Sequence, residues 1–597
     1  MQRTNYCGLI DKSYINQTIQ ITGWVNKRRD LGGLIFLDIR DREGIIQVIV
    51  EPQNEACFLI ANEIKHEYVI AVTGLVKYRQ SPNLKLANGD IECIASSIEI
   101  LNIATNLPIL IDELNSNELN RLSHRVIDLR RKNMQHNIRL RHKISMTIRR
   151  YLDDNGFIDI ETPYLTLSTP GGARDFLVPS RIHKGNFYAL PQSPQIFKQL
   201  LMVAGFDRYY QIVKCFRDEE LRADRQPEFT QVDIETAFLD ANQIRHINEQ
   251  MIKQVFIGVL NVTLNDFPVM TYADAMRYYG SDKPDLRFDL KLINLNKLFM
   301  NSKFSIFANI ANESEQKNNQ HYKTGIIAIK LPNQIKLSRK NIDEYTNFVA
   351  KYGISGLSYI KLLDLKTFEV QSPISKFLDL AEIKNIVLDN NMQNNETLLI
   401  AASVDNNVIE AMGQLRIKLA NDYELVDNNA WAPVWIIDFP MFEHDKATNT
   451  YKPCHHPFTA PKDEDIILLK TNPVMCLSKA YDLVLNGYEI GGGSIRIHSQ
   501  ELQQLIFDTI GLTPDEAKEK FACLLDNLKL GAPPHGGLAF GLDRLAMLMC
   551  NASSIREVIA FPKTTTSQCL LTNAPNFVAE TQLKELGISI NNLDKNL

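Results

Sequence analysis

The chain of 597 residues carries 65 basic and 70 acidic side chains, which give a formal charge of −5. A single hydrophobic core stops growing near about 250–300 residues, so this length predicts three or four domains. Hydrophobic residues make up 45% and charged residues 23%, which excludes disordered, collagen-like and coiled-coil chains. The near-neutral balance gives no global nucleic-acid footprint, so any RNA contact must come from local patches.

The nine cysteines are scattered and form no CxxC pair. Disulfide frameworks and zinc ribbons need clustered cysteines, so a reduced protein without structural zinc is expected. The first residues lack the apolar core of a signal peptide, and no run of about 18 apolar residues occurs. We therefore expect a cytoplasmic protein that is neither secreted nor inserted in a membrane.

Residues 1–105 are expected to form a small closed barrel, because short strand-like runs alternate there with turns. The expected strands are Ile19–Asn26, Leu34–Arg40, Gly44–Glu51, Tyr68–Tyr78 and Ile91–Ile100. Between Trp24 and Phe36 basic and aromatic residues interleave, as a surface for single-stranded RNA requires. An ordinary hairpin with Trp24 in the core is the alternative.

The rest of the chain divides into segments that differ in composition and in their helix and strand signals. Residues 106–135 are expected to be a hinge with a short helix, followed by a helix over Asn137–Asp154 and a strand over Phe157–Glu161. Mixed helices and strands continue to Arg287. The Asn- and Lys-rich block 288–421 is expected to be an inserted domain, after which strand-rich sequence resumes over 422–563 and a polar extension follows over 564–597.

A loop rich in alternating charges is expected within FRDEELRADRQPEFTQVDIE, residues 216–235, because strand-like sequence flanks it on both sides. An arginine fixed in such a hairpin can bind a phosphate or carboxylate with two donors, and Phe229 could stack on a base. A solvated charged hairpin is the alternative.

Two further segments contain residues that could bind a phosphate, a metal ion or a carboxylate. In GLAFGLDRLAML, residues 537–548, Arg544 falls where a glycine-rich run becomes helical, which suits a polyphosphate. Asp482 and Glu489 are seven residues apart, and each could lie at the end of a strand or on its inner face. If they converge, they suit Mg²⁺ held between carboxylates and phosphates, and two acids solvated at strand ends are the alternative. Arg496 follows three glycines, which have no side chains to cover the strand surface. One arginine on such a surface suits a small carboxylate ligand.

In chain order, the helix and strand ending at Pro163, the Arg217–Glu235 loop and the Gly537–Arg544 turn resemble the three motifs of class II aminoacyl-tRNA synthetases. The segments QSPQIFKQLLM (192–202), YGSDKPDLR (279–287) and HHPFTAP (455–461) are similar to those of bacterial-type aspartyl-tRNA synthetases of subclass IIb. The resemblance extends from near residue 3 to near residue 575.

The resemblance implies an α+β multidomain fold. Residues 1–105 would be an anticodon-binding OB-fold barrel. The antiparallel-sheet catalytic domain would span 136–287 and 422–563, interrupted by a GAD-like α/β domain at 288–421. The implied activity is that of an aspartate–tRNA ligase, which joins L-aspartate and ATP into aspartyl-adenylate and then charges tRNA(Asp). Mg²⁺ as cofactor and a homodimer built on residues 138–163 are also implied.

Residue roles follow from the same resemblance. Arg217 and Arg544 would be catalytic, and Asp482 and Glu489 would ligate Mg²⁺. ATP would be bound by Arg217, Asp218, Glu219, Gln226, Phe229, Glu489, Gly541, Leu542, Asp543 and Arg544. Aspartate would be bound by Gly171, Gln195, Lys198, Arg217, Asp233, His455 and Arg496. The tRNA would be bound by Arg29, Phe36, Gln47, Arg222 and Arg225.

One position departs from the pattern. Related sequences read Thr-Pro-Glu-Gly-Ala-Arg-Asp where this chain has Thr169-Pro-Gly-Gly-Ala-Arg-Asp175, so Gly171 replaces a glutamate near the substrate ammonium. Weaker aspartate binding is the expected result. An asparaginyl-tRNA synthetase, a non-catalytic RNA-binding paralogue, and an enzyme that also charges asparagine tRNA are the alternatives that the sequence leaves open.

Overall fold

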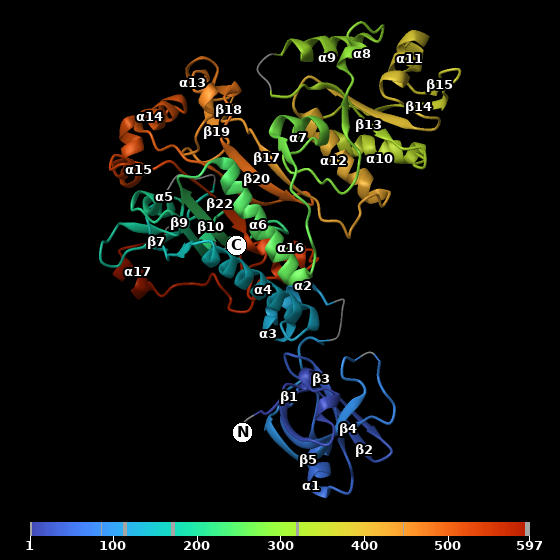
Figure 1. Ribbon diagram of the computed structural model, residues 1–597, viewed down its shortest axis with the longest axis vertical. Coiled ribbons are helices and arrows are strands. Elements are labelled where there is room, and N and C mark those ends of the chain that lie inside the picture. The colour runs from blue at the N-terminus through green and yellow to red at the C-terminus, as the bar shows by residue number, and fades with distance from the viewer. Residues whose placement is uncertain are drawn as a thin grey trace. The chain divides into compact units, whose positions relative to one another are not determined.

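The computed structural model describes residues 3–84, 86–111, 116–168, 173–317, 321–445 and 447–590 (Figure 1). The chain divides into two compact units. The first comprises Met1–His136 with Cys569–Ala574, and the second comprises Asn137–Gln568 with Pro575–Leu597.

The first unit contains the expected closed barrel, in the strand order β1-β2-β3-β5-β4. Every second residue of β2 (Ile35, Leu37 and Ile39) is buried in its core, as a strand with one inward face requires. The elements are β1 (Thr18–Leu31), β2 (Leu34–Arg40), β3 (Ile45–Val50), α1 (Glu55–Glu63), β4 (Val69–Tyr78) and β5 (Ile91–Asn102).

Strand β1 is longer than the sequence pattern predicted, because the basic run after Asn26 continues to pair with β2 as far as Leu31. Trp24 is only partly buried, and its ring lies under the guanidinium of Arg130, whose Cζ is 5.1 Å from the ring centroid. The alternative with Trp24 in the barrel core is therefore wrong.

The expected hinge region contains two short helices, α2 (Glu118–Ser123) and α3 (Arg125–Asp128). The helix that follows, α4 (Lys132–Asp154), begins five residues before the expected start at Asn137. The added first turn buries Met134.

An eight-stranded sheet forms the centre of the second unit, in the order β11-β17-β20-β21-β22-β10-β9-β6. Its inner strands are antiparallel, whereas β11 and β6 pair in parallel at the two edges. The strands are β6 (Ile158–Asp159), β9 (Arg208–Phe216), β10 (Glu228–Ala237), β11 (Val269–Thr271), β17 (Pro433–Ile437), β20 (Ala480–Leu485), β21 (Tyr488–Ile495) and β22 (His535–Gly541).

The two faces of this sheet differ in chemistry, as β10 illustrates. Val232 and Ile234 belong to a large apolar core with residues of α4, α6 (Ala241–Leu260) and α16 (Leu542–Met549). Successive side chains of a strand point to opposite faces, so Gln231, Asp233 and Glu235 face the other way. That second face carries the polar residues of the candidate site.

The remaining elements of the second unit surround the sheet. They are β7 (Leu177–Pro179), β8 (Phe187–Ala189), α5 (Gln195–Val203), α7 (Tyr272–Tyr279), β18 (Phe442–Asp445), β19 (Thr450–Pro453), α13 (Leu468–Thr471), α14 (Gln500–Thr509), α15 (Pro514–Leu528) and α17 (Glu580–Leu586).

The block expected to be inserted has a sheet of its own, in the order β12-β13-β16-β14-β15, with an apolar core on each face. Every pairing in it is antiparallel, so the expected α/β type is corrected to antiparallel α+β. The elements are β12 (Leu292–Asn294), α8 (Asn296–Phe299), α9 (Ser305–Gln316), β13 (Gly325–Leu331), α10 (Arg339–Ala350), β14 (Ser358–Asp364), β15 (Glu369–Gln371), α11 (Leu380–Asp389), β16 (Thr397–Ser403) and α12 (Asn407–Asp422).

This block meets the central sheet region through a close backbone contact between α12 and the end of α7. A Cβ added to Gly413 would lie 2.5 Å from the carbonyl oxygen of Gly280, which itself has a left-handed φ of 66°. Only glycine at both positions permits this approach.

Within the described residues, no helix is long and apolar enough to cross a bilayer.

Candidate active site

The charged loop lies between the antiparallel strands β9 and β10, as expected, and Arg217 is at its start. The backbone N–H of Arg217 donates to the carbonyl of Pro227 at 2.8 Å, and its guanidinium lies 5.0 Å from the centroid of the Phe229 ring. The Nε of Arg217 is buried without a hydrogen-bond partner among the described residues. Buried polar atoms without partners are rare in folded proteins, so this donor is available to an anion.

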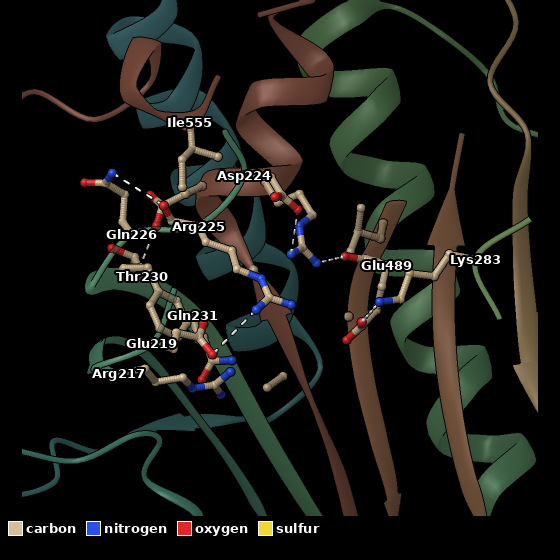
Figure 2. Close-up of a pocket in the computed structure, with 17 residues that line it drawn as sticks. Arg217, Glu219, Asp224, Arg225, Gln226, Thr230, Gln231, Lys283, Glu489 and Ile555 are labelled. Carbon is tan, nitrogen blue, oxygen red and sulfur yellow. Dashed lines mark hydrogen bonds and ion pairs between the residues drawn. The ribbon is translucent and has the colours of Figure 1, made fainter. Parts of the chain in front are cut away.

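Arg217 and other charged residues of the loop line a cavity, which we call the first cavity (Figure 2). Arg225 approaches Glu219 at 3.7 Å. Arg222 instead pairs with Glu220 at 3.3 Å near the surface and is well exposed. Asp218 donates its backbone N–H to the carbonyl of Arg174 at 3.0 Å. Of the two arginines of this loop that are expected to meet tRNA, only Arg225 lines the cavity.

Gln226 has an unexpected partner. Its amide nitrogen donates to the carbonyl of Lys563 at 3.0 Å, and its amide oxygen accepts from the Lys563 backbone N–H at 2.7 Å. The side chain is buried. Gln226 also lines the cavity, and a side-chain amide keeps a second N–H and a second acceptor lone pair for a ligand. Gln226 therefore anchors the loop, and its contact with a nucleotide stays a prediction.

The residues expected around the terminal phosphates divide into two groups. Arg544 lines the cavity; its Nη2 pairs with Asp224 at 3.1 Å, its Nη1 donates to the carbonyl of Glu489, and its Nε is buried without a described partner. Gly541 lines the same cavity at the N-cap of α16, whereas Leu542 is buried in the apolar core.

Asp543 is used within the fold. Its carboxylate accepts the Thr230 backbone N–H at 2.7 Å and pairs with Arg141 of α4 at 2.5 Å. Burial raises the pKa of Asp543 although Arg141 opposes this. This carboxylate joins α16 to β10 and α4, and so fixes the helix that carries Arg544.

Two carboxylates converge over Gly492. A Cβ at that position would lie 2.5 Å from Oδ1 of Asp482 and 3.5 Å from Oε1 of Glu489. Burial raises the pKa of Asp482, and the nearby Glu489 and Asp282 raise it further. Lys283, 3.4 Å from Glu489, supplies only partial counter-charge.

This carboxylate cluster fits Mg²⁺. The ion prefers oxygen ligands and is usually held by one or two carboxylates together with phosphates. Among the described residues no group of three His, Cys, Asp or Glu side chains is arranged to hold a metal.

A second cavity, of about 710 Å³, adjoins the first and has a charged floor. Lys198 of α5 lies 3.0 Å from Asp233 and 3.2 Å from Glu235, and Arg496 donates to Glu235 at 2.9 and 3.2 Å. All four residues are at most 5% exposed. Burial alone would raise the pKa of Glu235, but Arg496 and Lys198 lower it to about 2.

Three more features of this cavity point to a ligand. Burial raises the pKa of Asp233, whose Oδ2 has no hydrogen-bond partner among the described residues. Burial lowers the pKa of His455 to about 4, and its Nε2 is likewise unpartnered. Gln195 lines the cavity and donates to Gln199 at 3.0 Å. Arg217 and Glu489 line both cavities, so one arginine can reach ligands in both.

Glu235 was missing from the expected set. The pattern Asp233-Ile-Glu235 carries the signal, since residues two apart on a strand share a face. Gly171, expected near the substrate ammonium, lies outside the described residues.

In the barrel the three residues expected to meet RNA come together on adjacent strands. Arg29 pairs in register with Phe36, and its guanidinium lies 5.9 Å from that ring. The same guanidinium donates to Asp38 at 2.8 Å and to Gln47 at 3.2 Å. The result is a cation, a ring and an amide on one patch of the barrel.

Two family models match the chain. Residues 117–565 match the class II tRNA synthetases (D, K and N), and residues 19–101 match the OB-fold nucleic-acid-binding domain. The chain therefore belongs to the class II aminoacyl-tRNA synthetases of the aspartate, lysine and asparagine group. Enzymes of this family use ATP to attach an amino acid to tRNA, and the OB-fold is the anticodon domain.

Solved structures agree on the fold at low identity. The asparaginyl-tRNA synthetase of Pyrococcus horikoshii with asparaginyl-adenylate shares 16% identity at a TM-score of 0.58, covering 94% of this chain and 98% of that chain. An aspartyl-tRNA synthetase of Entamoeba histolytica shares 16% identity at a TM-score of 0.55, covering 92% of this chain and 89% of that chain. A putative aspartyl-tRNA synthetase of Leishmania major Friedlin shares 17% identity at a TM-score of 0.58, covering 94% of this chain and 93% of that chain. Identity at this level does not separate aspartate from asparagine.

Proposed function

We propose that the chain is an aspartate–tRNA ligase that charges tRNA(Asp), with the inserted block as a GAD-like domain. The observation that carries this choice is the composition of the cavity floor, where two cations, Lys198 and Arg496, accompany Glu235 and Asp233.

Charge balance favours aspartate in this cavity. The substrate ammonium would pair with the free oxygen of Asp233, and Glu235 compensates one of the two cations. One positive charge then remains for a side-chain carboxylate. Asparagine would leave that buried charge uncompensated, at a cost of about 3–5 kcal/mol, and lysine would add another cation.

The first chemical step joins the two cavities. Arg217, which lines both, would bind the α-carboxylate of aspartate and the α-phosphate of ATP together. The carboxylate oxygen attacks the α-phosphorus in line, the bond to the bridging oxygen breaks, and aspartyl-adenylate and pyrophosphate result. Phe229 would stack on adenine, Glu219 would contact its amino group, and Arg544 would hold the terminal phosphates. Positioning and preorganised charge supply the catalysis.

Asp482 and Glu489 would hold Mg²⁺, which when bound neutralises charge on the phosphate oxygens. The buried position of Asp482 beside Glu489 and Asp282 supports this assignment.

The second step transfers aspartate to the terminal adenosine of tRNA, whose hydroxyl attacks the carbonyl of the anhydride and releases AMP. Arg222 and Arg225 lie on the loop after Arg217 and would contact the acceptor end. Arg29, Phe36 and Gln47 would read the anticodon.

We also propose a homodimer. The resemblance places the interface at residues 138–163. Large apolar side chains that a partner could cover are exposed at the end of this segment and after it. They are Ile158, Leu165, Leu167, Leu177, Ile182 and Phe187. Sedimentation of the full chain, and of Ile182→Asp as a variant expected to be monomeric, tests this.

Pyrophosphate exchange with aspartate, asparagine and lysine separates the amino acid candidates. We expect exchange with aspartate to exceed that with the other two by at least a hundredfold. Stronger exchange with asparagine would overturn the proposal, and exchange with none would favour a non-catalytic RNA-binding protein. Charging purified aspartate and asparagine tRNAs side by side then tests the RNA specificity.

A further inference from the structure

Besides the contact of α12 with α7, the inserted block contacts the central sheet region through two adjacent residues. His321 donates from Nε2 to the backbone carbonyl of Val474 at 2.8 Å, and burial lowers the pKa of this imidazole. The next residue, Tyr322, packs its ring against Tyr272, with 6.2 Å between the centroids. These contacts hold Tyr322 against the first turn of α7.

From Tyr322 a series of ring contacts leads to the second cavity, which the proposed function takes as the amino acid site and which we call the amino acid cavity. Tyr272 packs on Phe439 at 5.3 Å, and Phe439 packs edge-on against the imidazole of His455 at 4.9 Å with an interplanar angle of 85°. Tyr272, Phe439 and His455 all line the cavity of about 710 Å³. Tyr322 is therefore three ring contacts away from a residue at the substrate.

The orientation of the His455 imidazole is the property that these ring contacts can affect. No partner among the described residues bonds its buried Nε2. A ring of this kind can rotate about χ2, whose preferences are broad, unless packing prevents it. The edge-to-face contact of Phe439 with His455 favours one relative orientation of the two rings by about 0.5–1.5 kcal/mol, whereas the two contacts before it are tilted, at 56° and 41°.

We propose that Tyr322 is a positioning residue for the amino acid cavity. Through Tyr272 and Phe439 it holds the His455 imidazole with Nε2 directed at the bound amino acid. This inference rests on the proposed function, because it takes the second cavity as the amino acid site. It gives the inserted block a part in amino acid binding.

The test compares Tyr322→Leu with Tyr322→Phe in the full chain by pyrophosphate exchange. Loss of the ring should raise the KM for the amino acid about fivefold or more, and should change kcat and the KM for ATP by less than twofold. Phenylalanine keeps the ring and should restore the KM to within twofold of wild type. An unchanged amino acid KM in Tyr322→Leu overturns the proposal.

A matched control lies in the same block. Tyr352 packs its ring on Phe348 at 5.7 Å within that block, and Tyr352→Leu should leave both KM values unchanged. An equal rise in amino acid KM from Tyr352→Leu would show a general effect of loosening the block and would also overturn the proposal.

A double-mutant cycle with His455→Ala tests the route of the effect. If Tyr322 acts through His455, Tyr322→Leu should add less than twofold to the KM of His455→Ala. Full additivity would contradict the inference. The assay uses whichever amino acid the wild-type protein activates, so a failure of the aspartate assignment would appear in wild type and remain distinct from a failure here.

Discussion

Arg496 and Glu235 lie side by side in the floor of the amino acid cavity, joined by two hydrogen bonds of 2.9 and 3.2 Å between guanidinium and carboxylate. Arg496 lines the cavity, whereas Glu235 is not among its described lining residues. The pair therefore presents a cation to the ligand while keeping its counter-charge behind it.

Replacing Glu235 with glutamine should destabilise the protein by about 3–5 kcal/mol, since it leaves Arg496 and Lys198 with one buried negative charge fewer. Thermal unfolding measures the loss. The matched control is Glu220→Gln, whose carboxylate is exposed and paired with Arg222, and which should change stability by no more than about 0.5 kcal/mol. Equal melting temperatures for the two variants would contradict the buried role of Glu235.

Arg217→Ala should lower the rate of pyrophosphate exchange at least about a hundredfold, because a preorganised charged donor at the reacting phosphate is worth about 3–4 kcal/mol. Arg222→Ala on the same loop should keep exchange within twofold and weaken only tRNA charging. Retention of more than a tenth of the exchange activity by Arg217→Ala would refute its assigned role.

Arg29→Ala should raise the KM for tRNA about tenfold and leave pyrophosphate exchange unchanged, since loss of a contact to one base costs about 1–3 kcal/mol. Arg42→Ala is the control, because Arg42 also lies over an aromatic ring of the barrel, that of Tyr6 at 4.7 Å. If both substitutions raise the KM equally, the barrel binds RNA by overall charge and the patch at Arg29 has no special part.

The protein should become less stable as the pH falls from 7 to 5, with His456 as one cause. Burial lowers the pKa of His456 to about 3, whereas an unfolded histidine titrates near about 6.5. Between these values the unfolded state binds the extra proton, so stability is lost as pH falls, by up to about 2 kcal/mol at pH 5.

Urea unfolding of His456→Asn at pH 7 and pH 5 measures this contribution. Asparagine can keep the acceptor that His456 offers to the Phe458 backbone N–H at 3.3 Å, and it does not titrate, so the variant should lose less stability on acidification. His444→Asn, at an exposed position, should behave as wild type. A wild-type pH dependence in His456→Asn would exclude the effect.

Local pattern predicted much of the fold. Short strand-like runs between turns predicted the barrel strands. The charged run between Phe216 and Glu228 predicted the loop between β9 and β10, and the glycine-rich turn before Arg544 predicted the start of α16. Each of these features depends on neighbours in sequence, so it could be read without tertiary information.

Features that depend on distant partners could not be predicted in this way. Gln226 bonds Lys563, which is 337 residues away, and only the folded chain shows this contact. The antiparallel sheet of the inserted block and the ring contacts of Tyr322 belong to the same kind, because helix and strand signals alone do not specify which elements pair.

The position of β10 in the sheet has a consequence for biosynthesis. Thr236 of β10 bonds Gly536 of β22, 300 residues later in the chain, so one edge of β10 stays unpaired while those residues are made. At about 5–20 residues per second the delay is roughly 15–60 s. During that time a growing chain carries an open strand edge, the kind of edge that promotes aggregation, and it needs protection on the ribosome until the sheet closes.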